Sequence, residues 1–484
     1  MMMKSGLIVS LLITLSGCST LTGNILTERA ATKVSCFPAL VDLDKLALQS
    51  GGTLIGNRIS GVPWLRHNRL ITHDIVKQTY SKPLYELLSR MSVLAQQGLR
   101  YELATVSAKQ QKHWQSRYQI KTTNDQFVKA CSNQLLQAQL NSPKKTLADL
   151  KAIPKDNDYS TLARVAGFYP LATVPFRLGV VKEQQQLQAD WRKIDGKHWI
   201  SYQPVSLNIT SSPSAMALLN RHAPVWHIDS DSSANLPGAP YWQGEQLEVN
   251  TKQATSYAFV SEARWKQQLV TQLNYVLWFT ERPQLKRLDW VAGQHDAVVF
   301  RVNLDQAGEV IAYDSIHLCG CWYRLFITEE FPFKPSNSYW REPILMHRIS
   351  LPSKSKPQMA IYLQSDTHQI QYLQPVTEAV IKVDQAVIAK NYQLQPFSAL
   401  LQLPTASGVR PVFNRSGYVT GSERPERWLF WPMGVKNPGA LRRFGDHAIS
   451  FVGRRYFDDP NLLSYFTLAP GNNDTGSNDN EYAH

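Results

Sequence analysis

The sequence lacks the short motifs that identify the commonest enzyme classes. It contains no Gly-x-Ser-x-Gly elbow, no P-loop, no dinucleotide-binding glycine fingerprint and no His-Glu-x-x-His helix. It also lacks the Cys-x-x-Cys-His pattern of covalently attached haem. After the N-terminus, no stretch approaches the roughly 18 apolar residues that a transmembrane helix needs. The motifs therefore point to no established reaction.

Charged residues are modest in number, and acids are fewer than bases. Asp and Glu total 38 against 51 Lys and Arg, which gives a formal net charge of +13. With 43% hydrophobic and 18% charged residues, the chain has the composition of a folded globular protein. A dispersed basic surface is the commonest cause of such a charge. A basic envelope protein can also meet anionic envelope components such as lipid, lipopolysaccharide or peptidoglycan carboxylates.

The N-terminus predicts a lipid anchor. Lys4 supplies a positive end, and the apolar run of residues 6–15 is too short to span a membrane as a mature helix. The run ends in Leu-Ser-Gly-Cys18, which is similar to the lipobox of bacterial lipoproteins, in which the cysteine is acylated and becomes the mature N-terminus. Ser19 stands where aspartate is associated with retention at the inner membrane. We therefore expect anchoring at the periplasmic face of the outer membrane, with no nucleic acid as partner.

Only five cysteines are present, and lipidation of Cys18 leaves four for an oxidising compartment. Four cysteines allow three pairings. The simplest partition joins Cys36 to Cys131 and leaves the close pair Cys319 and Cys321. We expect the first pair to fasten the N-terminal segment to a helix.

Periodicity divides the chain into regions of an α+β protein. Residues 1–17 are the expected signal peptide, 18–32 a tether and 33–190 a mainly helical region. Alternating apolar residues predict a mainly antiparallel sheet within 191–400. Residues 401–470 form an Arg-rich region, in which Asn437-Pro438 predicts the start of a helix that ends at Gly453. The Gly-, Asn-, Asp- and Ser-rich residues 471–484 predict a disordered tail.

The densest cluster of reactive residues is His317-x-Cys319-x-Cys321. If the preceding strand continues, these residues and Tyr323 share one face. A static disulfide beside a core histidine is the favoured interpretation. A zinc or copper(I) site, with a fourth ligand among His227, Asp229 and His295, is one alternative, and a redox-active pair is the other.

Several arginines make a second candidate site. Arg442, Arg443, Arg454 and Arg455 are the candidate anion-binding residues, because guanidinium groups form forked hydrogen bonds with phosphate or carboxylate. Pairing with internal carboxylates is the commoner role of such side chains. The catalytic residues, if any, are not indicated.

Several stretches resemble an uncharacterised family of bacterial envelope proteins. They include Cys-Phe-Pro-Ala-Leu from Cys36, Gly-Val-Pro-Trp-Leu-Arg from Gly61, Tyr-Asp-Ser-Ile-His with Cys-Gly-Cys from Tyr313, and Phe-Trp-Pro-Met-Gly-Val from Phe430. Relatives commonly have Tyr-His after the second cysteine, where this chain has Trp322-Tyr323. The resemblance implies that the protein is located in the cell envelope. The leading hypothesis is a binding or assembly role in the envelope, and the alternative is an enzyme that uses His317, Cys319 and Cys321.

Overall fold

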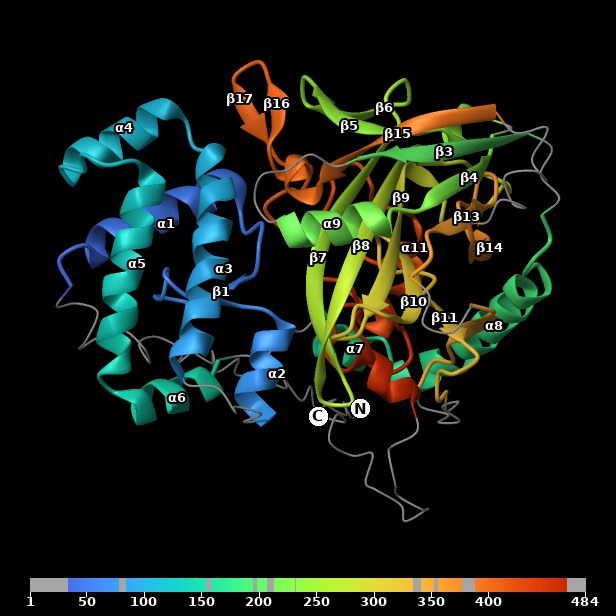
Figure 1. Ribbon diagram of the computed structural model, residues 1–484, viewed down its shortest axis with the longest axis horizontal. Coiled ribbons are helices and arrows are strands. Elements are labelled where there is room, and N and C mark those ends of the chain that lie inside the picture. Colours follow the sequence, from blue (N-terminus) through green and yellow to red (C-terminus); the bar gives the residue numbers. More distant parts are fainter. Residues whose placement is uncertain are drawn as a thin grey trace, which may run out of the picture.

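The computed structural model describes residues 34–77, 84–153, 158–194, 198–206, 213–230, 232–333, 341–351, 356–376 and 388–467. The expected signal peptide, the tether and the C-terminal tail therefore lie outside the described residues. A helical body and a large curled sheet lie side by side, and the C-terminal segment covers part of the sheet (Figure 1).

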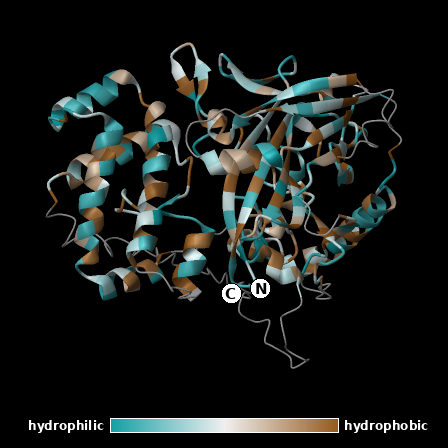
Figure 2. Cartoon of the chain, viewed as in Figure 1, coloured by the Kyte–Doolittle hydropathy of each residue, from teal (hydrophilic) through white to brown (hydrophobic). Residues whose placement is uncertain are grey.

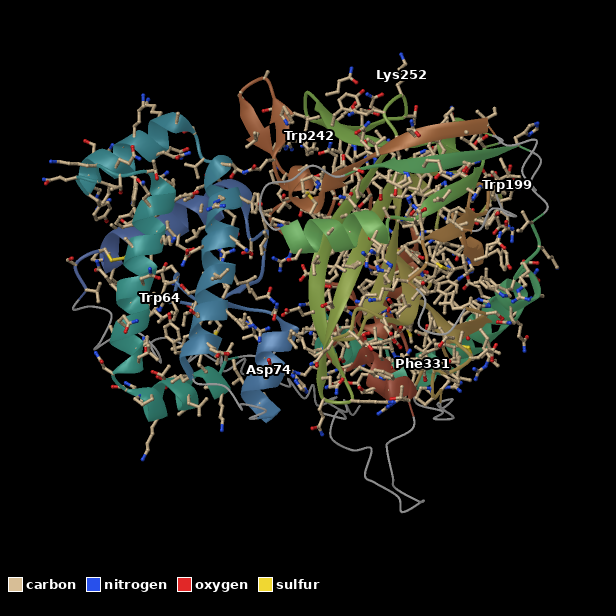
Figure 3. The ribbon with its side chains drawn as sticks, viewed as in Figure 1. Trp64, Asp74, Trp199, Trp242, Lys252 and Phe331 are labelled. Atoms are coloured by element: carbon tan, nitrogen blue, oxygen red, sulfur yellow. A yellow bond between two sulfur atoms is a disulfide. The ribbon has the colours of Figure 1, made fainter. Side chains whose placement is uncertain are left out.

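The helical body has its own core. Apolar residues at spacings of three and four place Leu88, Met91, Ala95 and Leu99 on the buried face of one helix. In Figure 2 the hydrophobic side of that helix faces its neighbours. Trp64 is fully buried among these helices (Figure 3). The elements are α1 (Phe37–Gly51), β1 (Asn57–Arg58), β2 (Arg66–His67), α2 (Arg69–Lys77), α3 (Leu84–Ala104), α4 (Ala108–Arg117), α5 (Asn124–Leu140) and α6 (Pro143–Lys151).

Two further helices lead to the sheet. The short α7 (Thr161–Ala166) begins at Ser160, whose hydroxyl accepts the N–H of Ala163. After a break at Gly167 and Phe168, α8 (Tyr169–Ala189) runs along the lower right of Figure 1. This long helix was not predicted, because Pro175 and Gly179 interrupt its sequence and most of its residues are polar or exposed.

The sheet has 13 strands and mixed pairing. Eight described strand pairs are antiparallel, but β12 on β11, β13 on β4, and β15 on both β3 and β7 are parallel, so the prediction of a mainly antiparallel sheet is only partly right. The long neighbours β7 (Thr255–Trp265), β8 (Gln268–Arg282), β9 (Gly293–Leu304), β10 (Val310–His317) and β11 (Arg324–Thr328) form its centre. The others are β3 (Trp199–Val205), β4 (Val225–Asp229), β5 (Pro237–Gln243), β6 (Gln246–Asn250), β12 (Leu345–Ile349), β13 (Met359–Leu363), β14 (Ile370–Pro375) and β15 (Ile388–Pro396).

The sheet curls until its two edges come near each other. Arg324 on β11 donates to the side chain of Gln369, and the N–H of Arg192 donates to Gln371 on β14 at 3.0 Å. Trp191, just after α8, stacks on His347 of β12 and contacts Tyr372 of β14. The curled inner face holds one core, onto which α9 (Pro213–Arg221) packs.

The outer face of β7–β11 is covered by the C-terminal segment, residues 397–467. This segment is mostly irregular, with η3 (Phe397–Leu401), β16 (Leu403–Thr405), β17 (Gly408–Arg410), α11 (Glu426–Phe430), η4 (Trp431–Met433) and η5 (Leu462–Phe466). The helix predicted from Asn437 to Gly453 is wrong. Asn437, Gly439 and Gly445 have positive φ angles, and the N–H of Arg442 donates to Leu318 beside the sheet. Long-range hydrogen bonds replace helical ones here.

Ion pairs join the helical body to the sheet. Asp74 of α2 lies between the two parts in Figure 3, and Arg264 of β7 donates to it at 2.7 Å. Burial alone would raise the pKa of Asp74, but hydrogen bonds with His73 and Arg264, with the charges of Arg264 and Arg90, lower it to about 2. Arg69 of α2 bonds Asp158 and Asp458 of the sheet-covering segments. The helical body is thus fixed against the sheet by charge as well as by packing.

The disulfide between Cys36 and Cys131 is present and closes a loop with a sequence separation of 95 residues. Replacing both cysteines by alanine should lower the free energy of unfolding by roughly 4 to 5 kcal/mol, because the unfolded chain regains the conformational entropy of that loop. Denaturant unfolding measures the loss, and peptide mapping without reduction should recover the bond. A bond from either cysteine to Cys319 or Cys321 would contradict the assignment.

Candidate functional site

The Cys-Gly-Cys sequence forms a tight turn between β10 and β11. The N–H of His317 donates to the carbonyl of Cys321 at 3.0 Å, and the N–H of Gly320 donates to that of His317 at 2.8 Å. Gly320 has φ of 92°, and a Cβ there would lie 2.4 Å from the carbonyl oxygen of Ala448. Glycine is required here because the C-terminal segment packs directly against the turn.

The predicted shared face of His317, Cys319, Cys321 and Tyr323 is wrong. Strand β10 ends at His317, so the alternation of side chains stops before the cysteines. The imidazole of His317 instead turns to Asp296 on β9, with 3.2 Å between Nδ1 and Oδ1. The histidine and the two thiols therefore do not converge on one point.

Asp296 is the centre of a buried polar cluster. Its carboxylate is fully buried and lies 3.2 Å from His317 Nδ1, 2.9 Å from His368 Nδ1 and 3.2 Å from Arg424 Nη2. His368 comes from the turn before β14, and Arg424 comes from the C-terminal segment. One carboxylate thus ties together β9 and three segments that are distant in the sequence.

Burial and the neighbouring Arg424 determine which groups in this cluster are charged. Burial alone would raise the pKa of Asp296, but His317, His368 and Arg424 outweigh it and hold that pKa well below its usual range. Burial lowers the pKa of His317 to about 4, in spite of Asp296. We therefore assign a carboxylate–guanidinium pair with a neutral His317 that donates its Nδ1–H.

The two thiols lie against each other on the other side of the turn. They form no disulfide in this structure, and the N–H of Cys321 donates to Cys319 Sγ at 3.3 Å. The hydrogen bond with Cys319, followed by burial and by the charge of Glu426, raises the pKa of Cys321 well above its usual value. At neutral pH Cys321 is therefore held as a thiol rather than as a thiolate.

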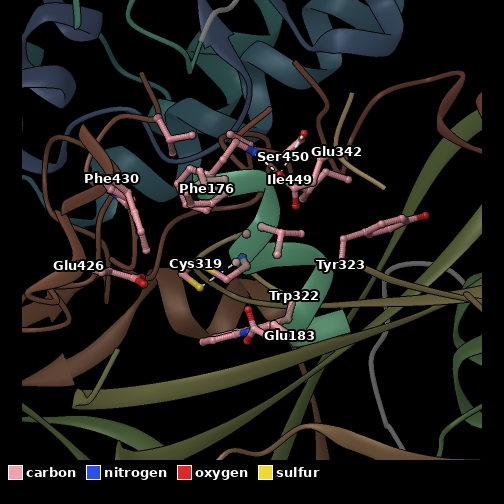
Figure 4. Close-up of a pocket in the computed structure, with 18 of the residues that line it drawn as sticks. Phe176, Glu183, Cys319, Trp322, Tyr323, Glu342, Glu426, Phe430, Ile449 and Ser450 are labelled. Carbon is pink, nitrogen blue, oxygen red and sulfur yellow. Dashed lines mark hydrogen bonds between the residues drawn. The ribbon is translucent and has the colours of Figure 1, made fainter. Parts of the chain in front are cut away.

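A cavity of about 410 Å³ opens beside the thiols. Its walls come from α8, the Cys-Gly-Cys turn, the end of β8, and two stretches of the C-terminal segment. Five aromatic residues belong to the lining: Phe176, Trp322, Tyr323, Phe430 and Phe451. Figure 4 shows this cavity with Cys319 and Trp322 on its wall, and with the carboxylate of Glu426 directed toward Cys319. A mainly apolar hollow with a few polar groups is the usual form of a small-molecule site.

Glu426 is the polar group in this cavity that most needs a partner. It is 3% exposed, and its Oε1 has no hydrogen-bond partner. Burial raises its pKa from near 4.5 to about 7, although Arg424 and Arg282 oppose the shift. The other acids on the wall are engaged, since Glu342 accepts the N–H of Phe451 at 2.7 Å and Glu183 accepts the indole N–H of Trp322 at 2.7 Å.

The lining arginines are also engaged. Arg282 donates to the carbonyl of Thr367 and lies over the ring of Trp322, while Arg324 donates to Gln369 and Arg455 to the carbonyl of Glu342. Arg324 Nε and the hydroxyl of Tyr323 also lack a hydrogen-bond partner, so the cavity offers a ligand an acceptor at Glu426 together with these donors.

The other predicted metal ligands are not brought to the cysteines. His227 and Asp229 lie on β4, which five strands separate from β10 in the sheet order. His227 stacks on Tyr362, and burial lowers its pKa to about 4. His295 is buried next to Asp296 on β9. In the described part of the chain, no group of three or more His, Cys, Asp or Glu side chains could hold a metal ion.

The four candidate anion-binding arginines are mainly structural. Arg442 donates to the carbonyls of Ala440, Asn437 and Asp446, and Arg443 forms two hydrogen bonds with the carboxylate of Asp446. Arg454 is exposed and contacts the hydroxyl of Thr161, whereas Arg455 is buried at the cavity wall. They do not gather around a common point in a way that suits one anion.

Sequence reasoning missed Asp296, His368 and the cavity wall on α8, and it placed Arg424 and Glu426 only among an Arg-rich group and its possible acidic partners. None of these residues forms a pattern with its neighbours along the chain. Asp296 is one of 38 acids, and its partners come from segments up to 128 residues away. The Cys-Gly-Cys segment was the one sequence signal that indicated where the candidate site lies.

Glu426→Gln should change how stability depends on pH. The folded state keeps the Glu426 proton up to about pH 7, whereas the unfolded chain loses it near 4.5. The stabilising contribution of protonated Glu426 is therefore present below pH 4.5 and is lost as pH rises to 7. Relative to the native protein, the variant should gain up to about 3 kcal/mol between pH 5 and pH 8.

Denaturant titrations at the two pH values measure this gain. Glu245→Gln, at an exposed carboxylate, is the matched control and should show no such difference. A Glu426→Gln effect that is equal at both pH values would contradict the raised pKa.

Comparisons with known proteins found no match, so a role can be argued only from the fold and the cavity. The chain matches no protein-family model, and no curated protein or solved structure is significantly similar to it. Within the described residues, none of the helices has the length and apolar character to cross a bilayer.

Proposed function

We propose that the protein is a lipid-anchored envelope protein that binds an amphiphilic molecule in the cavity beside the Cys-Gly-Cys turn. The lipobox at Cys18 supports an address at the periplasmic face of the outer membrane, and the disulfide between Cys36 and Cys131 fits an oxidising compartment. The binding role extends the hypothesis that the sequence suggests.

The observation that carries this proposal is Glu426 Oε1, a buried carboxylate oxygen without a hydrogen-bond partner at the wall of the cavity. A buried polar atom without a partner is costly, and a ligand that donates a hydrogen bond to Oε1 would remove that cost. Phe176 and Phe430, whose ring centroids are 5.1 Å apart, provide apolar surface nearby. The arrangement suits an apolar chain or ring that carries an ammonium or hydroxyl group as donor to Glu426.

A second candidate is thiol–disulfide exchange by Cys319 and Cys321, favoured by the contact of two unbonded thiols at the cavity wall. In that reaction the two thiols would give two electrons and two protons to a substrate disulfide and form their own bond. Glu426 is close enough to raise the pKa of Cys321 and could accept a proton. The raised pKa of the resting thiol makes this the weaker candidate, because thiolate is the nucleophile.

Ligand preference tests the binding role. Dodecylamine should displace the fluorescent probe N-phenyl-1-naphthylamine from the native protein at pH 8 at least about tenfold more effectively than dodecyl sulfate, because ionised Glu426 attracts the ammonium. Glu426→Gln should remove that preference, and Glu245→Gln should keep it. Equal displacement by the two amphiphiles would contradict the role of Glu426.

A steric variant tests the cavity itself. Gly179 lines the cavity from α8, and a Cβ there would meet no atom within 4 Å. Gly179→Trp should therefore fill part of the cavity and weaken probe binding at least about tenfold without strain. Gln185→Trp adds the same side chain to an exposed position of α8 outside the lining and should bind as the native protein does. Unchanged binding by Gly179→Trp would place the ligand elsewhere.

Alkylation kinetics separate the two candidates. Because the pKa of Cys321 is raised, its reaction with iodoacetamide should be slow at pH 7 and should accelerate about tenfold per pH unit up to that pKa. Glu426→Gln should speed the reaction, since the nearby negative charge is removed. Fast alkylation at pH 7, measured by mass spectrometry of the labelled peptide, would favour the redox candidate instead.

A further inference from the structure

Exposed apolar side chains are concentrated around the mouth of the cavity. Of the 21 large hydrophobic residues that are exposed in the described chain, twelve lie in three segments: residues 161–178, 283–292 and 426–433. We call these twelve residues the apolar rim: Leu162, Val165, Phe168, Leu171, Val174, Leu178, Leu285, Leu288, Trp290, Trp428, Leu429 and Trp431.

The three segments form one continuous surface. The N–H of Glu426 donates to the carbonyl of Trp290 at 2.9 Å, which joins the second segment to the third. Arg164 of α7 donates to the carbonyl of Met433 at 2.9 Å, which joins the first to the third. All three segments also contribute to the cavity lining, through Phe176, Val291 and Phe430. Figure 4 shows Phe176 and Phe430 near each other at the cavity.

The apolar side chains of α8 point away from the protein. Leu171, Val174 and Leu178 recur at spacings of three and four, which places them on one face of the helix, and Leu171 and Leu178 are 74% and 67% exposed. A helix of a soluble protein normally turns such a stripe to the core. Soluble monomers rarely expose large apolar patches, so the gathering of twelve such side chains on three joined segments suggests a contact with something apolar.

The composition of the rim fits a bilayer. Three of its residues are tryptophans, which favour the boundary between lipid headgroups and acyl chains. Within residues 161–189, 283–292 and 426–436, the exposed charged side chains are four cations (Lys182, Lys286, Arg287, Lys436) and one acid, Glu183. Glu183 accepts the indole N–H of Trp322. Half-buried Asp289 accepts two backbone N–H groups of its own loop. The surface is therefore apolar with a positive border, which complements anionic lipid.

The predicted anchor allows this contact. Residues 19–33 separate Cys18 from the first described residue, and a fully extended chain of that length reaches at most roughly 50 Å. An acyl chain on Cys18 would keep the protein near the membrane surface, so that the rim needs only a weak affinity to dock.

We propose that the apolar rim docks on an anionic bilayer, with α8 lying in the plane of the membrane and the mouth of the cavity facing the lipid. The acylated Cys18 and the apolar, positively bordered rim would then hold the protein on the membrane together. The proposal is independent of which molecule fills the cavity, because it concerns the outer surface of the rim.

Quenching by brominated lipid tests the contact with the full-length, lipidated protein. Vesicles of brominated phosphatidylcholine with 30% phosphatidylglycerol should quench tryptophan fluorescence, relative to vesicles with unbrominated chains. Joint substitution of Trp290, Trp428 and Trp431 by Phe should remove at least half of the quenching. Trp199→Phe, on β3 and outside the three segments of the rim, should leave it unchanged.

Charge and apolar variants complete the test. Joint substitution of Lys182, Lys286 and Arg287 by Glu should reduce quenching at least twofold in the anionic vesicles. The double substitution Leu171→Ser and Leu178→Ser should reduce it by the same factor, and both positions are exposed enough for the fold to tolerate serine. Equal quenching in the native protein and the three-tryptophan variant overturns the proposal. Self-association also overturns the proposal: if the protein cross-links to itself on the vesicles and brominated lipid does not quench its tryptophans, the rim is a protein contact.

Discussion

The fold depends on the compensation of one buried charge. Asp296 has no access to water, and an isolated carboxylate in that position would destabilise the folded state strongly. Arg424 supplies the opposite charge, and His317 and His368 supply N–H donors. Each partner comes from a different segment, so the carboxylate is satisfied only when the strand, the two turns and the C-terminal segment are all in place. The cluster thereby selects one arrangement of a sheet that could otherwise pair in several ways.

The same cluster positions the cavity. Arg424 is fixed by Asp296 and by the carbonyl of His295, and Glu426 follows two residues later at the cavity wall. His317 ends β10 in contact with Asp296, so the turn that carries Cys319 starts from a fixed point. The acid that faces the cavity and the thiols beside it therefore lie on short extensions of one rigid network. This is the support that a binding site needs, because a ligand gains affinity from groups that are held in place beforehand.

What could be predicted from the sequence was local. The apolar spacing of α3 and α5, the alternation along β7 to β10, and the pairing of Cys36 with Cys131 all appear in the structure. The parallel pairs of β15 could not be predicted, because they join strands that lie far apart in the chain. At the site, the sequence identified the Cys-Gly-Cys segment. The prediction that His317 shares a face with the cysteines failed because strand β10 ends at His317. Nothing along the chain distinguishes Asp296 or Glu426 from other acids, since their importance comes from burial.

Two features of the structure reduce its stability, and they occur at the same place. Glu426 is a buried carboxylate without a partner for Oε1, and the apolar rim exposes side chains such as Leu178 and Trp428 that would be more stable out of water. Other buried charges are paired, as Arg301–Asp314 and Arg66–Glu102 show, although Arg66 Nε itself has no hydrogen-bond partner. Buried polar atoms without partners also occur elsewhere in the described chain, but at this cavity such an atom and a group of exposed apolar side chains occur together. An amphiphile inside the cavity would supply a hydrogen-bond donor to Glu426, and lipid outside would remove the apolar rim from water.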